Sequence, residues 1–391
     1  MSATGAIDLD AQRPDHAVPD ISVVMPCLDE AGSVGTCVEK ALEGIRRTGL
    51  SGEVVVSDNG STDDSVAVAS KAGARVVRQP ERGYGNAYLK GFAEARGRYI
   101  IMGDSDGSYD FTQIDRLIEP LRHGYDYVLG SRFAGRILPG AMPWSHRYIG
   151  NPVLTGVLNT LFKVDSSDAH SGMRSFTRDA YRRMDLQSAG MELASEIVIK
   201  AAQVGLRGTE VPITYHPREG ESKLHSVRDG WRHLRFMLLL SPEWLFVWPG
   251  IAMLVLGMVG QGLLLRGPLN VGFHALDVHF SALFALLAIL GYQTLLFGVF
   301  AKTCLPVGDG DRMQRWFDRN YSLERGLVGG GVAFLVGFAI DAAILVHWLR
   351  KGLGPINSLR PALLAMTLMM VGAQTGFAAF FLSLFRMDRQ P

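Results

Sequence analysis

This chain of 391 residues has few cysteines, no excess of charge of either sign, and no long apolar run within residues 1–20. Its three cysteines, Cys27, Cys37 and Cys304, have neither metal-ligand spacing nor the even number of a closed disulfide framework, which favours a reducing compartment. Lys and Arg together number 39 and Asp and Glu 38, so no global basic field indicates a nucleic-acid partner. Residues 1–20 are polar and lack the apolar core of a signal peptide, so we expect a disordered tail.

Short apolar runs alternate with amphipathic stretches through the first half of the chain. Strands are predicted at 21–25, 53–57, 74–78, 99–102 and 125–129, and helices near 30–47, from 62, over 84–95 and from 111. This alternation predicts an α/β domain at 21–223, with a mostly parallel, Rossmann-like sheet covered on both faces. Ligands of such sheets bind beyond the carboxyl ends of the strands.

Long apolar runs are absent from the first half and dominate the second. Four of them, at 244–265, 280–301, 327–348 and 363–385, are about 22 residues each, enough to cross a hydrocarbon core of about 30 Å. Buried helices of a soluble domain are the alternative, but four such lengths in succession rarely pack into a soluble core. We therefore predict an all-α, four-span transmembrane domain at 244–391. Lys and Arg gather in the loop after the second run, which places the first domain in the cytoplasm.

Between the two halves, residues 224–243 combine a basic and an apolar face. On a helix, Arg228, Arg232 and Arg235 share one face, and Trp231 and Leu234 share another. A basic amphipathic helix beside a membrane span predicts an interfacial element on anionic lipid. The alternative is a solvated helix of the first domain.

A pair of carboxylates, Asp104 and Asp106, directly follows the apolar run at 99–102. Two carboxylates at a strand end can hold a divalent metal against a diphosphate, and hard oxygen ligands suit Mg²⁺ or Mn²⁺. Alone the pair is a weak signal, because turns favour Asp. The segments SVVMPCLDE (22–30) and VVSDNGSTD (55–63) end the first two predicted strands and strengthen it.

Together these three segments resemble the family 2 glycosyltransferases of the GT-A fold, over about 21–240. Within that family the chain most resembles the synthases that join mannose or glucose to dolichyl or other polyprenyl phosphates. That closer resemblance depends on four segments, which are GSR (130–132), DAHSG (168–172), ELASE (192–196) and GESKL (220–224). It implies a hexose transfer from a nucleotide-sugar, UDP-glucose or GDP-mannose, to a polyprenyl phosphate.

The resemblance also implies roles on the donor side. Pro26, Asp29 and Glu30 are expected along the nucleotide, and Asp58 at its base or ribose. Turn or helix-cap duty is the alternative for Asp29 and Asp58. The segment GYGNA (83–87) either starts a helix or brings backbone N–H groups to the diphosphate.

At the metal, Asp104 is expected to face the nucleotide-sugar as well as the ion, and Asp106 to ligate the ion. Relatives often have Gln two residues after the second Asp; here that place holds Ser108, the candidate third ligand. We assign Asp104 and Asp106 to catalysis, together with the basic residues Arg132 and Lys223.

On the acceptor side, Arg132, Ser171 and Lys223 are the implied phosphate ligands, with Arg218 as a secondary one, because phosphate requires cationic and hydroxyl donors that converge. A solvated surface charge is the alternative for each basic residue. Lys223 lies in a Gly- and Ser-containing loop that can close over the donor. Asp168 is expected to orient an acceptor-side group.

A phosphate acceptor also simplifies the chemistry. It is mostly dianionic at pH 7 and needs no general base, and direct displacement predicts inversion at the anomeric carbon. Relatives with hydroxyl acceptors carry a Glu-Asp pair after the metal motif, and no such dipeptide follows Asp106 here. A hydroxyl acceptor stays as one alternative, with Glu192, Glu196 or Asp168 as its base, although Glu196 can equally be an ordinary exposed carboxylate.

A catalytically inactive membrane scaffold is the second alternative. The expected setting is a multi-pass protein of the bacterial inner membrane whose partners are nucleotide-sugar, polyprenyl phosphate and the lipid bilayer. A homo-oligomer is compatible with these features.

Overall fold

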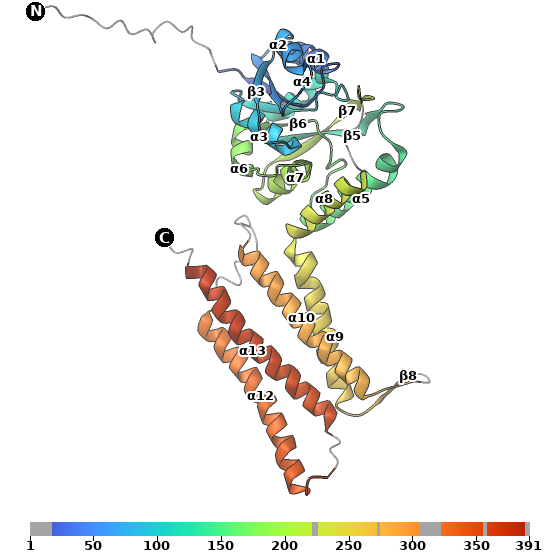
Figure 1. Ribbon diagram of the computed structural model, residues 1–391, viewed down its shortest axis with the longest axis vertical. Helices are drawn as coiled ribbons and strands as arrows, with labels where there is room; N and C mark the ends of the chain where they lie inside the picture. Colours follow the sequence, from blue (N-terminus) through green and yellow to red (C-terminus); the bar gives the residue numbers. More distant parts are fainter. Residues whose placement is uncertain (1–17, 221–225, 272–273, 305–321, 355–357, 388–391) are drawn as a thin grey trace, which may run out of the picture. The chain divides into compact units, whose positions relative to one another are not determined.

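The computed structural model describes residues 18–220, 226–271, 274–304, 322–354 and 358–387 (Figure 1). Most of the predicted tail and the candidate residue Lys223 lie outside these ranges. The chain divides into two compact units, Met1–Met237 and Leu238–Pro391, which are described separately.

The first unit is built on a seven-stranded sheet in the order β3-β2-β1-β4-β6-β5-β7. Its strands are β1 (Ile21–Cys27), β2 (Gly52–Asp58), β3 (Arg75–Arg78), β4 (Tyr99–Met102), β5 (Tyr127–Ile137), β6 (Arg174–Thr177) and β7 (Gly208–Tyr215). Strands β1 to β4 pair in parallel, as do β5 and β7, whereas β6 runs antiparallel to both β4 and β5. The mostly parallel α/β domain expected of the GT-A fold is therefore confirmed, with β6 as its single reversed strand among the described residues.

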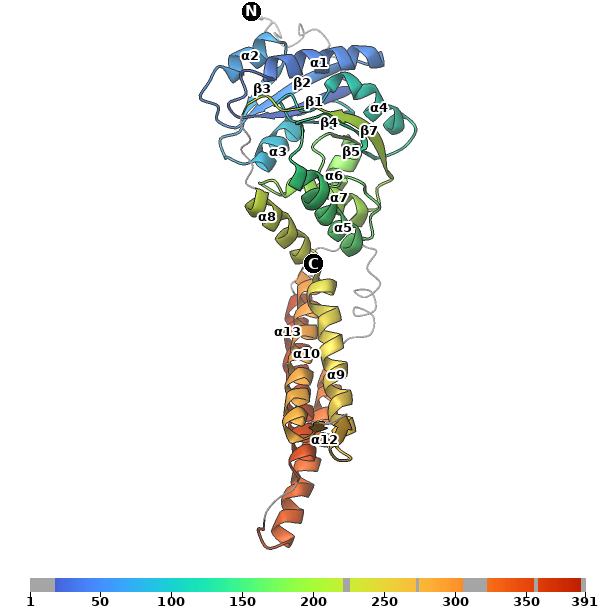
Figure 2. The ribbon, with the colours of Figure 1, turned by 90° about the vertical axis from the view of Figure 1, so that its right-hand side faces the viewer.

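Helices cover both faces of this sheet. They are α1 (Val34–Thr48), α2 (Ser65–Lys71), α3 (Tyr84–Glu94), α4 (Ile114–Arg122), α5 (Asn151–Phe162), α6 (Arg178–Met184) and α7 (Leu193–Gln203), and α8 (Ser226–Leu239) follows. Figure 2 shows α1 and α2 on one side of the sheet and α3, α6 and α7 on the other.

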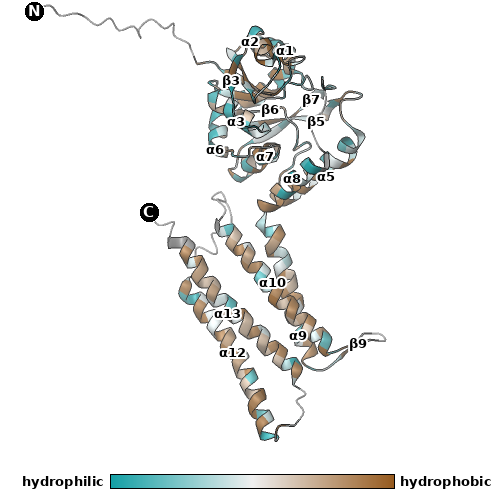
Figure 3. Ribbon diagram, viewed as in Figure 1, coloured by the Kyte–Doolittle hydropathy of each residue, from teal (hydrophilic) through white to brown (hydrophobic). Residues whose placement is uncertain are grey.

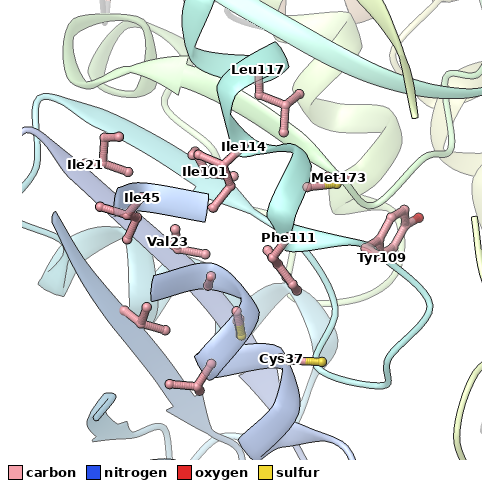
Figure 4. Packing of buried hydrophobic residues seen from close by; sticks show 14 of the residues in the cluster. Ile21, Val23, Cys37, Ile45, Ile101, Tyr109, Phe111, Ile114, Leu117 and Met173 are labelled. Atoms are coloured by element: carbon pink, nitrogen blue, oxygen red, sulfur yellow. The ribbon is translucent and has the colours of Figure 1, made fainter. Parts of the chain in front are cut away.

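Alternation along β1 explains the two cores. Val23 and Met25 point into the cluster formed with α1 and α4, part of which Figure 4 shows, while Val24 points into the cluster formed with α3, α6 and α7. Both sides of the central strands are thus apolar. The polar residues that end these strands are left at the carboxyl edge of the sheet.

The second unit contains four helices that are long and apolar enough to cross a membrane, among the described residues. They cover Glu243–Leu264, Val278–Thr303, Leu323–Arg350 and Leu359–Leu384, so each predicted span is confirmed as a helix. The first includes a π-helical turn, Glu243–Val247, before α9 (Trp248–Leu264). The others belong to α10 (Val278–Cys304), α12 (Leu323–Arg350) and α13 (Leu359–Met387). Figure 3 shows that most of their residues are hydrophobic.

Glycines set the distance between these helices. A Cβ added to Gly250 of α9 would lie 2.6 Å from the backbone nitrogen of Leu295 in α10. One added to Gly372 of α13 would lie 2.5 Å from the carbonyl oxygen of Gly330 in α12. Such backbone contact is typical of helices that associate in lipid. A short hairpin that the sequence did not predict, β8 (Leu269–Val271) and β9 (His274–Leu276), connects α9 to α10.

Candidate active site

Asp104 lies just beyond the end of β4, where two tyrosines from α3 hold it. The hydroxyls of Tyr84 and Tyr88 each donate to Asp104 Oδ1, both at 2.9 Å. Burial raises the pKa of Asp104 to about 6 and the nearby charge of Asp106 adds to the shift, while the two phenol hydrogen bonds lower it. Asp104 therefore remains mostly ionised at pH 7, with Oδ1 already engaged.

Asp106 is anchored by its own turn. The backbone N–H and the hydroxyl of Ser108 donate to Asp106 Oδ1 at 3.0 and 2.5 Å. The other oxygen, Oδ2, lies 3.6 Å from Nη1 of Arg218. Ser108 thus orients the carboxylate, and its role as a third metal ligand stays a prediction.

The two carboxylates fit a diphosphate-bound cation. The described residues contain no group of three or more His, Cys, Asp or Glu side chains arranged to enclose a metal. Mg²⁺ commonly uses one or two carboxylates and takes its other ligands from substrate phosphates and water. A pair such as Asp104 and Asp106 meets that requirement.

Arg218, expected near the acceptor, lies on the side of the nucleotide-binding candidates. Its Nη2 is 3.3 Å from Glu30 Oε1, and its Nη1 faces Asp106. Its Nε is buried without a hydrogen-bond partner among the described residues. A guanidinium between two carboxylates can neutralise them or turn to an incoming phosphate.

The donor-side candidates tie the ends of β1 and β2 together. Asp29, in the left-handed region at φ 51°, accepts from the backbone N–H of Thr62 at 2.7 Å, a bond that lowers its pKa. Asp58 accepts from the backbone N–H of Ser61 at 3.0 Å and is buried. The carbonyl of Pro26 accepts from the hydroxyl of Ser105, inside the carboxylate motif. The turn role given above as the alternative for Asp29 and Asp58 is therefore present, and their contact with a nucleotide remains a prediction.

Arg132, one of the acceptor candidates, is held by Asp168. Its Nε and Nη2 each donate to one oxygen of the Asp168 carboxylate at 2.7 Å, and its backbone N–H donates at 3.0 Å. Burial works against the charge of Arg132, but Asp168 outweighs it and holds the arginine pKa above its usual value. The guanidinium also lies 5.1 Å from the ring centre of Tyr215. Arg132 is therefore a preorganised cation that Asp168 orients, and its contact with an acceptor remains a prediction.

Ser171, the other described acceptor candidate, is fully buried. Its hydroxyl has no hydrogen-bond partner among the described residues. Gly172 follows it, and a Cβ there would lie 2.9 Å from Asp104 Oδ2. The loop at 168–172 therefore extends from the Arg132–Asp168 ion pair to the carboxylate motif.

Glu196 is not the exposed carboxylate that one alternative proposed. It is 4% exposed and accepts from the backbone N–H groups of Gln187 and Ser188 at 2.8–3.1 Å. The segment that it holds packs on the start of α3, where a Cβ at Gly85 would collide with the Ser188 carbonyl oxygen. The GYGNA segment is thus confirmed as a helix start.

Sequence reasoning missed Tyr84 and Tyr88. Their spacing of four residues puts both phenols on one face of α3, and this spacing was the available signal. What could not be read from it was which buried group that face would meet.

Two parts of the chain match known protein families. Residues 22–185 match the family described as glycosyl transferase family 2, and residues 306–386 match the family 2 C-terminal transmembrane region. The low-salt glycan biosynthesis hexosyltransferase Agl6 of Haloferax volcanii is 42% identical over 93% of this chain and 88% of its own length. The dolichyl-phosphate hexose transferase of the same archaeon is 30% identical over 55% of this chain and 91% of its own.

Among solved structures, a glucosyl-3-phosphoglycerate synthase from Mycobacterium tuberculosis, crystallised with Mn²⁺, UDP and glucosyl-3-phosphoglycerate, aligns with a TM-score of 0.46. That alignment has 22% identity and covers 59% of this chain and 85% of that one. The near full-length similarity to Agl6 and the two family matches show that the chain is a membrane protein of glycosyltransferase family 2.

Proposed function

We propose that this enzyme transfers a hexose from a nucleotide-sugar to a polyprenyl phosphate, with inversion at the anomeric carbon. The observation that carries the proposal is the use of both Asp168 oxygens by Arg132. Glu196 is likewise engaged by backbone N–H groups. Two of the three carboxylates that could act as base for a hydroxyl acceptor are therefore occupied, whereas a phosphate dianion needs a fixed cation and no base.

The donor side supplies the leaving-group chemistry. Asp104 and Asp106 would hold Mg²⁺ or Mn²⁺, which when bound acts as a Lewis acid on the diphosphate. Tyr84, Tyr88 and Ser108 orient these carboxylates before any ligand arrives, so little reorganisation is required. Pro26, Asp29, Glu30 and Asp58 are proposed to line the nucleotide, and Arg218 to balance charge beside it.

The acceptor side suits a lipid. The chain carries no Asp or Glu from 127 to 164, yet this stretch includes Arg132, Arg136, Arg147 and Lys163. Large apolar side chains are exposed there at Trp144, Tyr148, Ile149 and Val153. Aromatic and basic residues together favour the headgroup region of a bilayer. The dolichyl-phosphate hexose transferase that resembles this chain supports the same acceptor class.

We further propose that the catalytic unit lies on the cytoplasmic side of the membrane, with α8 at the interface. Basic residues between the second and third spans support this orientation. Arg228, Arg232 and Arg235 of α8 are exposed, and so is Trp231, as an interfacial helix requires. The archaeal origin of the relatives described above does not single out a bacterial inner membrane.

The test is a transfer assay in membranes that contain the full chain. Labelled UDP-glucose and GDP-mannose are supplied separately, each with Mn²⁺ or Mg²⁺ and a polyprenyl phosphate, beside Asp106→Ala. We expect an organic-extractable, acid-labile labelled product with one donor, opposite in anomeric configuration to that donor and absent from the variant. A product formed only with a sugar or lipid hydroxyl would overturn the acceptor assignment. If the wild-type chain showed neither transfer nor nucleotide-sugar binding, the alternative of a catalytically inactive scaffold would be favoured.

A further inference from the structure

A cluster of two histidines and a serine joins α8 to the acceptor side of the site. The hydroxyl of Ser195 in α7 lies 2.8 Å from Nδ1 of His233 in α8 and 3.3 Å from Nε2 of His170. The two imidazole rings meet edge to face, with centres 4.8 Å apart. Ser195 is fully buried and His233 is 8% exposed. Three segments that are distant in sequence therefore meet at one hydroxyl.

The chemistry of the cluster favours neutral rings. Burial lowers the pKa of His170 well below its usual value, and burial also lowers that of His233. A serine hydroxyl has one proton, so it can donate to one ring nitrogen and must accept from the other. His170 Nδ1 is buried with no hydrogen-bond partner among the described residues. Because the bond to Ser195 is the only hydrogen bond of that ring in the described chain, its loss would leave His170 held by packing alone.

His170 belongs to a loop that is otherwise rigid. The fully buried Arg174 donates to the carbonyls of Ala169 and Ser171 within the loop, at 2.8 Å each. It also donates to the carbonyl of Ala194 in α7 at 2.6 Å. A guanidinium that links loop and helix makes 168–172 move as one body rather than residue by residue.

The same loop reaches both halves of the chemistry. Asp168 at its start holds Arg132 through two side-chain hydrogen bonds. Gly172 at its end lies against Asp104 Oδ2 and donates its N–H to the hydroxyl of Tyr109 at 2.7 Å. Asp168 is hydrogen-bonded to Arg132, whereas Gly172 only approaches Asp104, so a displacement of His170 would act on the site mainly through Arg132.

We propose that His170, Ser195 and His233 are positioning residues. Through them the position of α8 determines where the Asp168–Arg132 pair lies, and thus how Arg132 meets the lipid phosphate. The inference depends on the proposed function, since it assigns Arg132 to that phosphate. None of the three touches the reacting atoms. Their effect is on the binding of the acceptor, because they set the position of the cation that meets its phosphate.

The test uses the full chain in lipid bilayers and compares His233→Leu, Ser195→Ala and His233→Asn. We expect the first two to raise KM for polyprenyl phosphate by about tenfold or more, with KM for the donor unchanged. Asn places a polar atom near the position of Nδ1, so His233→Asn should restore most of the acceptor affinity. His123→Leu, the same change at an exposed histidine of the catalytic unit, is the matched control.

Three outcomes would overturn the inference. They are an unchanged acceptor KM, an equal rise in both KM values, and a fall in kcat alone, which a purely structural role predicts. Wild type without any lipid-linked product would instead defeat the proposed function. In that case backbone hydrogen exchange decides, because His233→Leu should still speed exchange at 168–174 and not in β1 or β2. Equal exchange in wild type and variant would refute the coupling.

Discussion

The two units of this chain differ in which polar groups they bury along the middle of their elements. In the catalytic unit, three charges are taken inside and partnered: Arg174 by three carbonyls, Glu196 by backbone N–H groups, and Arg132 by Asp168. In the described membrane helices, the Gln261–Thr367 hydrogen bond joins neutral groups and glycines bring backbones together, while the buried Lys302 pairs with Glu243 near the ends of its helix and of the first span. A water-facing domain can use buried charge to orient a site. Helices in lipid gain no hydrophobic advantage from association and depend on close packing.

The two units also differ in how many large apolar side chains they expose. Phe377 and Val328 of the membrane unit are 77% and 67% exposed, as expected where lipid replaces water. In the catalytic unit, comparable exposure of large apolar residues occurs at Trp144 and its neighbours. An apolar surface is therefore ordinary in one unit and informative in the other.

The largest predicted effect is on the charge pair. Asp168→Asn removes half of a buried pair and leaves Arg132 without its counter-charge, which should cost about 3–5 kcal/mol in the catalytic unit. Heat inactivation of nucleotide-sugar binding measures the loss. Glu119→Gln, which removes an exposed carboxylate 3.5 Å from His123, should change stability by no more than about 0.5 kcal/mol. Equal melting of Asp168→Asn and wild type would show that the pair contributes no stability.

Close packing makes the membrane unit sensitive to a single methyl group. Gly372→Ala places its Cβ against the Gly330 carbonyl and should destabilise the α12–α13 contact by about 1–3 kcal/mol. Gly376→Ala is the matched control on the same helix, because its nearest neighbour would be 4.0 Å away. Thermal unfolding in bilayer discs should separate the two variants while donor binding survives in both. Similar melting of both would contradict glycine-mediated packing.

A third test concerns Asp104, whose charge is proposed to serve catalysis but should lower the stability of the folded state. Its pKa of about 6 exceeds the value of 3.8 expected when unfolded, so the folded state favours the protonated acid. That contribution to stability is complete below pH 3.8 and is lost as the pH rises through 6. Metal-free Asp104→Asn should therefore melt above wild type at pH 7.5 and lose this advantage on acidification to pH 5, while transfer is abolished. A constant difference in Tm at the two pH values would refute the assignment.

The smallest effect is expected at the neutral pair in the membrane unit. Thr367→Val removes the hydroxyl that Gln261 contacts at 3.1 Å, and comparable membrane pairs contribute about 0.6 kcal/mol. Thr294→Val, whose hydroxyl bonds to a carbonyl of its own helix, serves as control. A loss as large as that of Asp168→Asn would erase the contrast between the units.

Prediction from sequence succeeded where the signal was local. The membrane spans depend on length and composition, and the first strands on apolar runs bounded by turns. It missed β6 and β7 as strands, since β6 is four residues long, opens on the fully buried Arg174, and finds both partners far away in the chain. It left Glu196 open between a solvent-exposed and a functional role, because a carboxylate on an amphipathic helix looks the same until its neighbours are known.

The sequence alone determined that carboxylates follow β4, that a transferase-like sheet precedes four membrane spans, and that Mg²⁺ or Mn²⁺ suits the motif. These are properties of adjacent residues. Only the tertiary structure decided the partners of those groups: Tyr84 and Tyr88 on Asp104, 20 and 16 positions apart, and Asp168 on Arg132, 36 positions apart. Hydrogen bonds reach about 3 Å whatever the separation along the chain, so folding, and not spacing, chooses which donor meets which acceptor.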